Sequence, residues 1–416
     1  MSTQFQTARA DVASFLPVIM CCLAAVCEGF DLQAPGVTAP VLRGVFHMSP
    51  SQTGTFLSMS TFGMMLGALI GGRLSDRIGR KWVLIGSIAT FSVLTVFTVL
   101  ATSTQMLYWI RLATGLGLGG ALPNLVALAM ESVAPERRST AVGLMLAGPA
   151  IGGALASLLA AVAATPQQWP MVYYAGGLVP FFLIVPLLIA FIPNRPVVTE
   201  ATIEATPGTL KALFGEGRAM RTLAVWLGLF SILLVLFVLL GWLPTLMVDR
   251  GLSRPQASLV QLIFNLSAIP GSILSGLVLD YVLRRRKSLF LATAFVAAIG
   301  SILLLAGLPA TLGVMVLGAA FAGISVIGGQ TIIYALAPTC YPRWGRGTGV
   351  GFAVAIGRFG SAGGPLLTGY LVAFGLTSAQ ALMTLLPIIA LAGIAALFIA
   401  VSVSAVARVE VQAQRA

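Results

Sequence analysis

Four ionisable residues interrupt long apolar stretches of the chain: Glu28, Asp31, Arg111 and Arg358. If those stretches cross a membrane, each charge costs ~2.5–3.5 kcal/mol or more at the bilayer centre, so each residue is a candidate for function. Glu28 and Asp31 lie three positions apart, which places them on one face of a helix. Desolvation and mutual repulsion both favour proton uptake by such a pair. We therefore predict that at least one of the two carboxylates couples transport to protons.

Arg111 gives the acidic pair a second interpretation. Asp31 could neutralise Arg111 as an ion pair between helices, and the proton affinity of the pair would then respond to conformation. Arg111 is expected about one turn inside the outer surface, where its side chain could equally extend towards water or bond backbone carbonyls. The sequence therefore leaves two interpretations of Arg111 open: a role in proton coupling, and a structural role at the membrane surface.

Arg358 lies in the middle of an apolar stretch that is rich in glycine. A guanidinium group inside a bundle needs an anion, and its planar fork fits a carboxylate with two hydrogen bonds. We predict that Arg358 binds a substrate carboxylate; the alternative is a salt bridge to Asp31 or Glu28. Five polar or aromatic residues could line such a pocket, or form only interhelical hydrogen bonds. They are Gln330, Tyr334, Trp242, Asn124 and Asn265.

The composition is that of a membrane protein. Of the 416 residues, 58% are hydrophobic and 9% are charged, and the mean hydropathy is +0.99. A soluble domain has about 25% charged residues. The net charge of +12 comes from short basic clusters between apolar stretches, so it indicates membrane topology and not nucleic-acid binding. The N-terminal apolar stretch is too long for a cleaved signal peptide and lacks a cleavage site of small residues.

Charges divide the chain into segments of measurable length. Three charge-free gaps, at 139–194, 288–342 and 359–407, contain 56, 55 and 49 residues. A helix needs about 20 apolar residues to cross the hydrocarbon core, so each gap holds two crossings. Turn residues mark the joins at 165–168, 307–310 and 375–379. Single crossings are expected at 15–38, 51–72, 82–102, 107–130, 223–248 and 256–281, which makes twelve in all.

The basic residues predict the orientation of these crossings. With the N-terminus inside, the inside segments hold 19 of the 24 Lys and Arg residues, the outside loops hold 3, and Arg111 and Arg358 lie within helices. Cytoplasmic loops of membrane proteins carry such an excess. We expect a multi-pass protein of the bacterial inner membrane with both termini in the cytoplasm.

Two sequence matches indicate an internal duplication. Gly72, Asp76 and Arg80 recur at an offset of 204, as Gly276, Asp280 and Arg284. Thr140, Val142, Gly143 and Gly152 recur at an offset of 208, as Thr348, Val350, Gly351 and Gly360. An even number of crossings in each half gives both halves one orientation, as in parallel repeats. The expected fold is an all-α membrane protein with two six-helix repeats, at 1–192 and 222–416, joined by a cytoplasmic linker at 193–221.

The remaining charged residues are expected to have conformational and not chemical roles. Charged residues at the inside ends of the helices are expected to form a conformational lock, and they are Asp76, Arg77, Arg80, Arg137, Asp280 and Arg284. His47, the only histidine, falls in an outside loop and is not expected to relay protons. The chain has no phosphate-binding lysine loop, zinc-type His/Cys cluster or Ser-His-Asp set. We expect neither an enzyme nor a bound metal or cofactor.

Several motifs resemble the signatures of the major facilitator superfamily. GRLSDRIGRK at 72–81, its weaker copy at 275–287 and RLATGLGLGG at 111–120 are similar to superfamily motifs. EGFDLQAPG at 28–36 resembles the acidic-Gly-aromatic-Asp motif of the aromatic acid/proton symporters. Three further segments resemble sequences of the same symporter family: GWLPTLM at 241–247, GGQTIIYALAP at 328–338 and RGTGVGFAVAIGRFGSAGGPLLTG at 346–369. The likeness covers nearly the whole chain.

The resemblance implies a function and a branch of the family. Glu28, where benzoate-type members have Asp, and ALPNLVAL at 121–128 are similar to the 3-(3-hydroxyphenyl)propionate transporters. The implied activity is proton-coupled import of an aromatic carboxylate by a monomer in the lipid bilayer. The substrate would bind near the midplane between the halves, with its carboxylate on Arg358. The resemblance leaves open whether the substrate is a benzoate or a longer phenylpropanoid.

Two rival functions share some of these features. A proton-coupled antiporter that exports drugs or another organic anion would have the same fold. A membrane receptor would need a signalling domain, and the longest polar stretch, 193–221, has no room for one. The direction of transport would separate the symporter from the antiporter.

Overall fold

The computed structural model describes the backbone of residues 2–134, 137–163, 165–192, 209–215, 217–278, 287–307, 309–342 and 345–413. Side chains are described within these ranges except at 2–15, 76, 138–140, 287–288 and 404–413. Twelve helical segments in the described part are long and apolar enough to cross a membrane, which confirms the expected all-α fold. The chain divides into two compact units, Met1–Thr199 and Glu200–Ala416.

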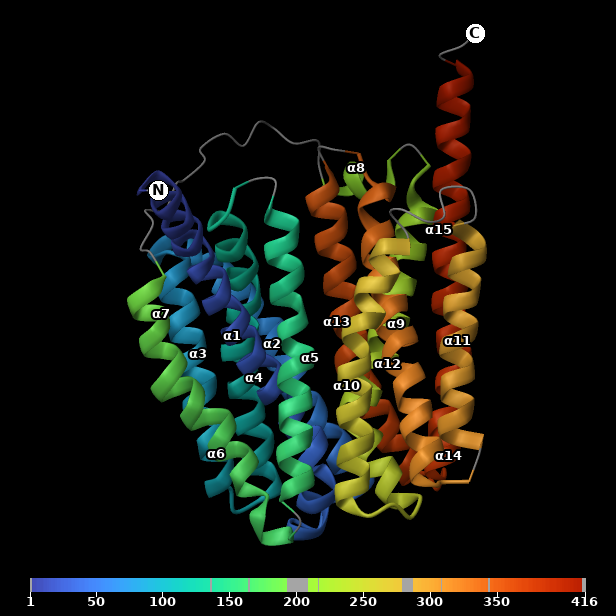
Figure 1. Cartoon of the computed structure of the whole chain (residues 1–416). Helices are drawn as coiled ribbons and strands as arrows, with labels where there is room; N and C mark the ends of the chain where they lie inside the picture. The colour runs from blue at the N-terminus through green and yellow to red at the C-terminus, as the bar shows by residue number, and fades with distance from the viewer. Residues whose placement is uncertain are drawn as a thin grey trace. The chain divides into compact units, whose positions relative to one another are not determined.

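Unit 1 contains six spans (Figure 1). Five are single helices, namely α1 (Ser2–Val45), α2 (Pro50–Ile78), α3 (Arg80–Phe97), α4 (Thr104–Glu131) and α5 (Arg138–Val162). The sixth begins as α6 (Pro170–Val179), passes through a π-helical turn (Pro180–Ile184) and ends as α7 (Val185–Phe191). The proline at the start of the π-helical turn lacks an N–H, which favours such a local change of helical pitch.

Unit 2 contains the short helix α8 (Thr209–Phe214) followed by six spans. The first five spans are α9 (Ala219–Asp249), α10 (Arg254–Leu277), α11 (Lys287–Gly307), α12 (Leu312–Leu336) and α13 (Arg346–Ala373). The last span combines α14 (Ser378–Met383) with α15 (Leu385–Ala413). Helix α8 occupies part of the stretch expected to be a linker, whereas residues 193–208 of that stretch lie outside the described part.

Several spans begin at residues that cap a helix. Ser49 accepts a hydrogen bond from the Gln52 backbone N–H at the start of α2, and the Gln52 side chain bonds back to the Ser49 N–H. Thr377 and Gln380 form the same capping box before α14. These caps satisfy N–H groups that the first helical turn leaves without partners. The caps therefore fix where α2 and α14 begin.

The first span differs most from its expected bounds. It was expected to end at residue 38, but α1 continues to Val45 and contains Pro35 and Pro40. A proline inside a helix removes one backbone donor, and membrane helices tolerate it where other groups satisfy the freed carbonyl. One such carbonyl belongs to the candidate site described below.

The two units use the same helix pairs. In unit 1, α2 packs most extensively on α4 and α1 on α5; in unit 2, the equivalent pairs are α10 with α12 and α9 with α13. Gly67 lies against the Leu116 backbone, and Gly271, 204 positions later, lies against the Ile324 backbone. At each position an added Cβ would collide with backbone atoms. Close approach of these helices therefore requires glycine in both repeats.

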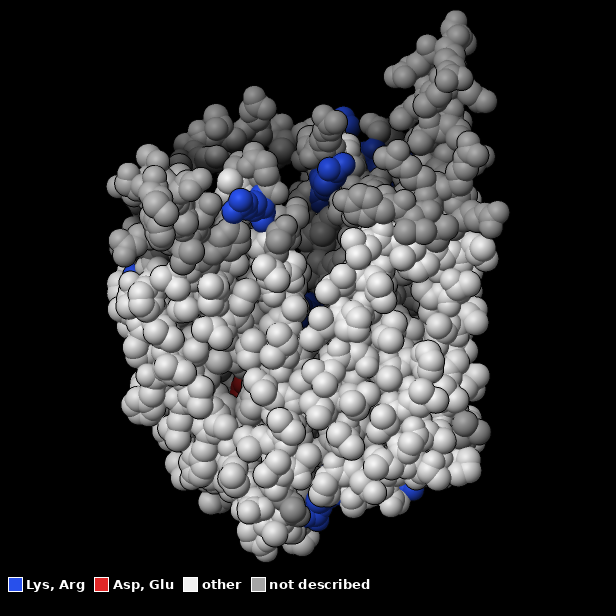
Figure 2. Space-filling model, viewed as in Figure 1, with Lys and Arg blue, Asp and Glu red and all other residues white. Residues whose placement is uncertain are grey.

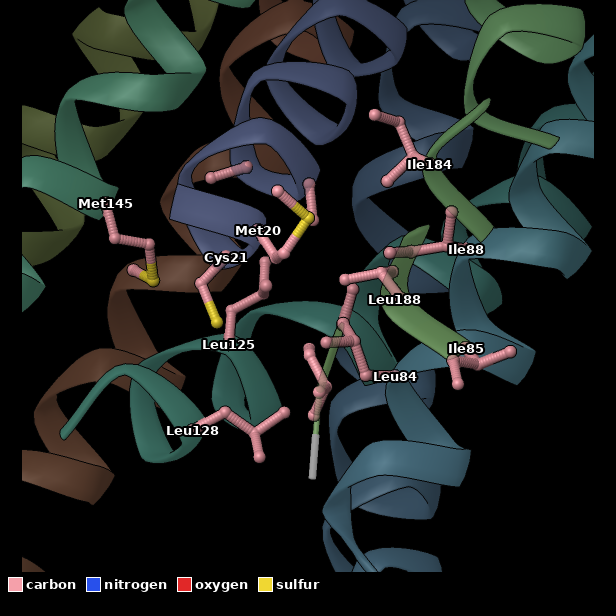
Figure 3. Packing of buried hydrophobic residues seen from close by; sticks show 14 of the residues in the cluster. Met20, Cys21, Leu84, Ile85, Ile88, Leu125, Leu128, Met145, Ile184 and Leu188 are labelled. Atoms are coloured by element: carbon pink, nitrogen blue, oxygen red, sulfur yellow. The ribbon is translucent and has the colours of Figure 1, made fainter. Parts of the chain in front are cut away.

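The interior of unit 1 includes a cluster of apolar side chains from all six spans, part of which is drawn in Figure 3. Met20 and Cys21 of α1 face Leu84 and Ile88 of α3 and Leu125 of α4. Cys21 is a free thiol within this cluster, so it packs as a small apolar side chain. On the visible face in Figure 2, Lys and Arg lie near the ends of the helices and the surface between them is almost free of charge.

Candidate functional site

The central feature of unit 1 is a buried ion pair between α1 and α4. The Arg111 guanidinium donates from Nη2 to Asp31 Oδ2 at 3.2 Å and from Nη1 to Oδ1 at 3.3 Å. Both side chains are 0% exposed. The interpretation in which Asp31 neutralises Arg111 therefore describes this structure. The alternative in which Arg111 extends towards water is wrong, because its side chain is 0% exposed and bonds to groups of α1 and α2.

Hydroxyl groups from two further helices hold the pair. The Ser60 hydroxyl of α2 accepts a hydrogen bond from Arg111 Nε at 2.9 Å. The Thr95 hydroxyl of α3 donates to Asp31 Oδ1. Four helices thus contribute to one polar network, and the sequence analysis identified neither hydroxyl. A serine or threonine among apolar residues carries little signal by itself.

Pro35 explains a further contact of Arg111. A helical carbonyl normally accepts a hydrogen bond from the N–H four residues later, and Pro35 has no N–H to offer the Asp31 carbonyl. Arg111 Nη2 donates to this carbonyl at 3.0 Å. The guanidinium therefore binds both the side chain and the freed backbone oxygen of Asp31.

A tyrosine of the sixth span lies close to this network. The Tyr173 hydroxyl is hydrogen-bonded to Thr38 Oγ1 of α1 at 2.8 Å, and Tyr173 is within electrostatic reach of both Asp31 and Arg111. The Trp169 ring packs edge-on against the Tyr173 ring, with 5.6 Å between centroids. Neither aromatic residue was predicted to belong to the site.

Glu28 lies one helical turn before Asp31 on α1 and is 3% exposed. The residue after it, Gly29, abuts the backbone of Pro149 in α5, and an added Cβ would collide there. On the same helix, the buried Gln33 side chain fills the space beside Gly153 of α5. Glu28 is therefore positioned by a close contact between α1 and α5.

In unit 2, three of the predicted substrate residues come together. Gln330 and Tyr334 lie one turn apart on one face of α12. The Arg358 charge, from the middle of α13, acts on the Tyr334 hydroxyl. All three side chains are partly exposed, although their positions fall well inside spanning helices. A cation, a phenol and an amide, each partly exposed, are thus grouped in unit 2.

The other predicted pocket residues have structural contacts. Trp242 is fully buried, and its indole N–H donates to the Pro365 carbonyl of α13 at 2.9 Å. The buried amide of Asn124 donates to the Gly120 carbonyl at 2.8 Å, and that of Asn265 to the Gln261 carbonyl at 3.1 Å. The Trp242 bond joins α9 to α13, so it is an interhelical hydrogen bond of the kind expected as the alternative to a pocket role. The bonds of Asn124 and Asn265 lie within their own helices and fit neither expectation.

The lock residues are only partly described. Arg80, at the start of α3, forms an ion pair with Glu131 at the end of α4, a partner that the sequence analysis did not identify. Arg77 and Arg137 have exposed side chains. The side chain of Asp76 and all of Asp280 and Arg284 lie outside the described residues. Lys81, next to Arg80, donates to the Ile189 carbonyl of α7 at 2.8 Å.

The described side chains contain no group of three or more His, Cys, Asp or Glu residues that could hold a metal ion. The carboxylates among the described residues can exchange protons, and Arg358 can capture a polar anion by ionic hydrogen bonds. The two charged centres differ in environment, since the Asp31–Arg111 pair is enclosed and Arg358 is partly exposed.

Comparison with known proteins extends these observations. The sequence model of the Major Facilitator Superfamily matches residues 21–281 and residues 225–414. The 3-(3-hydroxy-phenyl)propionate transporter of Escherichia coli K12 is 40% identical over 380 residues, covering 91% of this chain and 92% of the relative. The gallate transporter of Pseudomonas putida is 32% identical over 392 residues, covering 87% of this chain and 86% of the relative. These relatives are transporters and not enzymes.

Solved structures share the fold at low identity. A D-xylose-proton symporter has a TM-score of 0.74 at 17% identity, covering 92% of this chain and 97% of its own. An inward-facing bacterial homolog of the human lysosomal transporter Spinster has a TM-score of 0.76 at 16% identity, covering 93% and 97%. The fold, the family model and the relatives agree: the chain is a member of the major facilitator superfamily.

Proposed function

We propose that the protein is a proton-coupled symporter that imports an aromatic carboxylate, of the hydroxyphenylpropionate or hydroxybenzoate type, by alternating access. The observation that carries this proposal is the group formed by Arg358, Tyr334 and Gln330 in unit 2. Its three side chains are partly exposed at positions well inside spanning helices. A charge at such depth is expensive unless water or a ligand reaches it.

The chemistry of this group fits an aromatic acid. A guanidinium binds a carboxylate through two parallel hydrogen bonds, which a lysine cannot reproduce. The phenol and amide can donate to or accept from a ring substituent, and the Tyr334 ring offers apolar surface. The names of the relatives, which include transporters of hydroxyphenylpropionate, gallate and 4-hydroxybenzoate, support the same class of substrate.

The acidic residues of α1 support the proton step of the proposal. A carboxylate in a membrane span needs a cation or a proton. Arg111 is the cation of Asp31, so protonation of Asp31 would leave the buried guanidinium without its anion. Proton binding there would therefore favour a rearrangement of α1 against α4. Glu28 lies one turn away and is nearly as buried, so it is the second proton site that we propose.

Uptake by proteoliposomes tests the proposal. Radiolabelled 3-(3-hydroxyphenyl)propionate and 4-hydroxybenzoate would be offered with and without an imposed pH gradient, acidic outside. We expect gradient-driven accumulation by the wild-type protein and a loss of at least tenfold in Arg358→Ala, the cost of one charge-assisted hydrogen bond of about 1.5–3 kcal/mol. Arg358→Lys should recover little, because it keeps the charge and loses the fork.

Arg254→Ala provides the matched control. Arg254 is the first residue of α10 and lies outside the proposed site, so uptake should remain near the wild-type rate. Undiminished uptake by Arg358→Ala would remove the carboxylate anchor. Extrusion of the labelled acid against the gradient would identify an antiporter instead.

A further inference from the structure

Helix α6 contacts α1 on both sides of Pro35. Before the proline, Gly176 of α6 lies so close to Phe30 that an added Cβ would be 3.0 Å from Cε1 of the ring. After the proline, the Tyr173 hydroxyl of α6 is hydrogen-bonded to Thr38 at 2.8 Å. Because a proline has no N–H, the two parts of α1 are joined by one backbone hydrogen bond fewer than in a regular helix. Helix α6 thus bridges the point at which α1 lacks this bond.

The hydrogen bond between Tyr173 and Thr38 has a direction. The Thr38 hydroxyl donates its single hydrogen to the Ala34 carbonyl at 2.7 Å, so it accepts the hydrogen of the Tyr173 hydroxyl. Tyr173 is 0% exposed and Thr38 is 2% exposed, so bulk water does not compete for this bond. A hydrogen bond in such surroundings is stronger than one in water. The Tyr173 hydroxyl therefore fixes the turn of α1 that follows Pro35.

The same helix, α6, also reaches the ion pair of Asp31 and Arg111. Tyr173 is within electrostatic reach of both charged groups. One turn later on α6, an added Cβ at Gly176 would be 3.4 Å from the methyl group of Thr95, whose hydroxyl donates to Asp31 Oδ1. The position of α6 thus bears on Asp31 both through α1 and through the hydroxyl that Asp31 accepts from.

Aromatic packing holds the Tyr173 ring independently of its hydroxyl. The Trp169 ring lies edge-on to the Tyr173 ring, and the Phe46 ring, one residue after α1, lies edge-on to Trp169 with 6.5 Å between centroids. Such edge-to-face contacts favour one arrangement of the rings. A phenylalanine in place of Tyr173 should therefore keep the packing and lose only the hydrogen bond to Thr38.

We propose that Tyr173 is a positioning residue for the proton step: its bond to Thr38 holds the part of α1 after Pro35 so that Asp31 stays against Arg111. This role rests on the proposed function, in which protonation of Asp31 favours a rearrangement of α1 against α4. Tyr173 itself exchanges no proton in this step. It acts through the geometry of the ion pair.

The groups around Asp31 give the direction of the effect. Its ionisable neighbours are the Arg111 cation of α4, the Tyr173 phenol of α6 and Glu28, one turn earlier on α1. Helices α2 and α3 contribute hydroxyl groups to the ion pair, and α5 packs on this part of α1 through glycine and proline. A looser contact with Arg111 weakens the attraction that favours the charged carboxylate. Proton binding would then occur at higher pH.

Counterflow of labelled 3-(3-hydroxyphenyl)propionate in proteoliposomes, with equal pH on both sides, tests this role. Counterflow needs no gradient, so its pH dependence reports proton binding by the transporter. We expect the midpoint of this dependence to lie about 0.5–1 pH unit higher in Tyr173→Phe than in the wild type, the shift that corresponds to one lost hydrogen bond. Thr38→Val should give the same shift, and the double variant should give no larger one, because all three lose the same bond. Thr38→Ser keeps the hydroxyl and should retain the wild-type midpoint.

Tyr174→Phe provides the matched control. Tyr174 is the next residue of α6 and is 42% exposed, so its phenol does not share the buried contacts of Tyr173 and the midpoint should not move. An unshifted midpoint in the folded Tyr173→Phe and Thr38→Val proteins, or a shift to lower pH, would overturn the positioning role and leave the proposed function intact. Counterflow by the wild type that does not depend on pH would overturn the proposed proton coupling, and the role of Tyr173 with it.

Discussion

At the scale of single residues, Asp31 and Arg111 depend on each other and on the groups around them. Removing two charges from water is expensive, and their attraction offsets this cost only when further hydrogen bonds satisfy the remaining atoms. Here Ser60 and Thr95 supply two of those bonds, and the Asp31 carbonyl freed by Pro35 accepts a third. The pair is therefore stable as a unit but sensitive to loss of either member.

This dependence predicts a non-additive effect on stability. Arg111→Met leaves the Asp31 carboxylate buried without its cation, and Asp31→Leu leaves the guanidinium without its anion. Each change should lower the free energy of unfolding by about 3–5 kcal/mol. The double variant should lose less than either single variant, because no isolated charge remains. Thermal unfolding of the purified protein measures this, and a double variant with the summed loss of both would contradict it.

Glu28 permits a separate prediction about coupling. Glu28→Gln keeps the size and hydrogen-bonding ability of the side chain and cannot exchange a proton. If Glu28 carries the coupled proton, the variant should exchange labelled substrate across the membrane while losing accumulation driven by a pH gradient. Counterflow and gradient-driven uptake in the same proteoliposomes separate the two activities. Gradient-driven accumulation at the wild-type level would exclude Glu28 and leave Asp31 as the proton carrier.

At the scale of helices, glycine positions determine how closely the spans pack. Gly152 of α5 lies against the Val26 carbonyl of α1, and Gly360 of α13 lies against the Phe230 carbonyl of α9. The glycines are related by an offset of 208 and their partners by 204. The same helix crossing thus occurs in both units. In each, the backbone of the partner helix occupies the space that a side chain at the glycine would need.

The duplicated crossings provide a prediction with internal controls. Gly152→Ala and Gly360→Ala should each destabilise the protein by about 1–3 kcal/mol, because the helices must separate to admit a methyl group. Gly143 and Gly351 are also related by 208, and an added Cβ meets nothing within 4 Å at either position. Alanine there should be neutral or stabilising by up to about 1 kcal/mol. Thermal unfolding of the four variants would show the contrast, and equal effects at all four positions would refute it.

At the scale of the whole molecule, the scaffold is repeated and the mid-span charged residues are not. The positions equivalent to Glu28 and Asp31 at an offset of 204 are Ile232 and Val235. The position equivalent to Arg358 at an offset of 208 is Ala150. The mid-span carboxylates thus belong to unit 1 alone and the mid-span Arg358 to unit 2 alone. We propose that the repeats have diverged into a proton-binding unit and a carboxylate-binding unit.

The charge distribution also predicts the topology of the whole chain. The four native cysteines lie in or at the ends of spanning helices, so single exposed cysteines can be introduced as reporters. A membrane-impermeant maleimide applied to intact cells should label His47→Cys and Phe374→Cys, and should label Thr209→Cys only after permeabilisation. Labelling of Thr209→Cys in intact cells would reverse the predicted orientation.

Sequence reasoning was strongest where a property depends on segment length or on repetition. The number of spans follows from the bilayer thickness and the length of apolar stretches, and the expected turn near 165–168 corresponds to the break between α5 and α6. The extension of α1 to Val45 was missed, because α1 continues through Pro35 and Pro40 and the tolerance of a membrane helix for proline depends on its neighbours.

For the candidate site too, the sequence predicted some features and the tertiary structure was needed for others. The sequence by itself determined that Glu28, Asp31, Arg111 and Arg358 lie within the apolar segments that form the candidate spans, because an ionisable residue inside an apolar stretch is visible without knowledge of its partners. Only the tertiary structure decided that Asp31 pairs with Arg111 and that Trp242 holds α13 by a hydrogen bond. Partnership depends on which helices are neighbours and how they are rotated. Contacts between residues far apart in the chain set both properties.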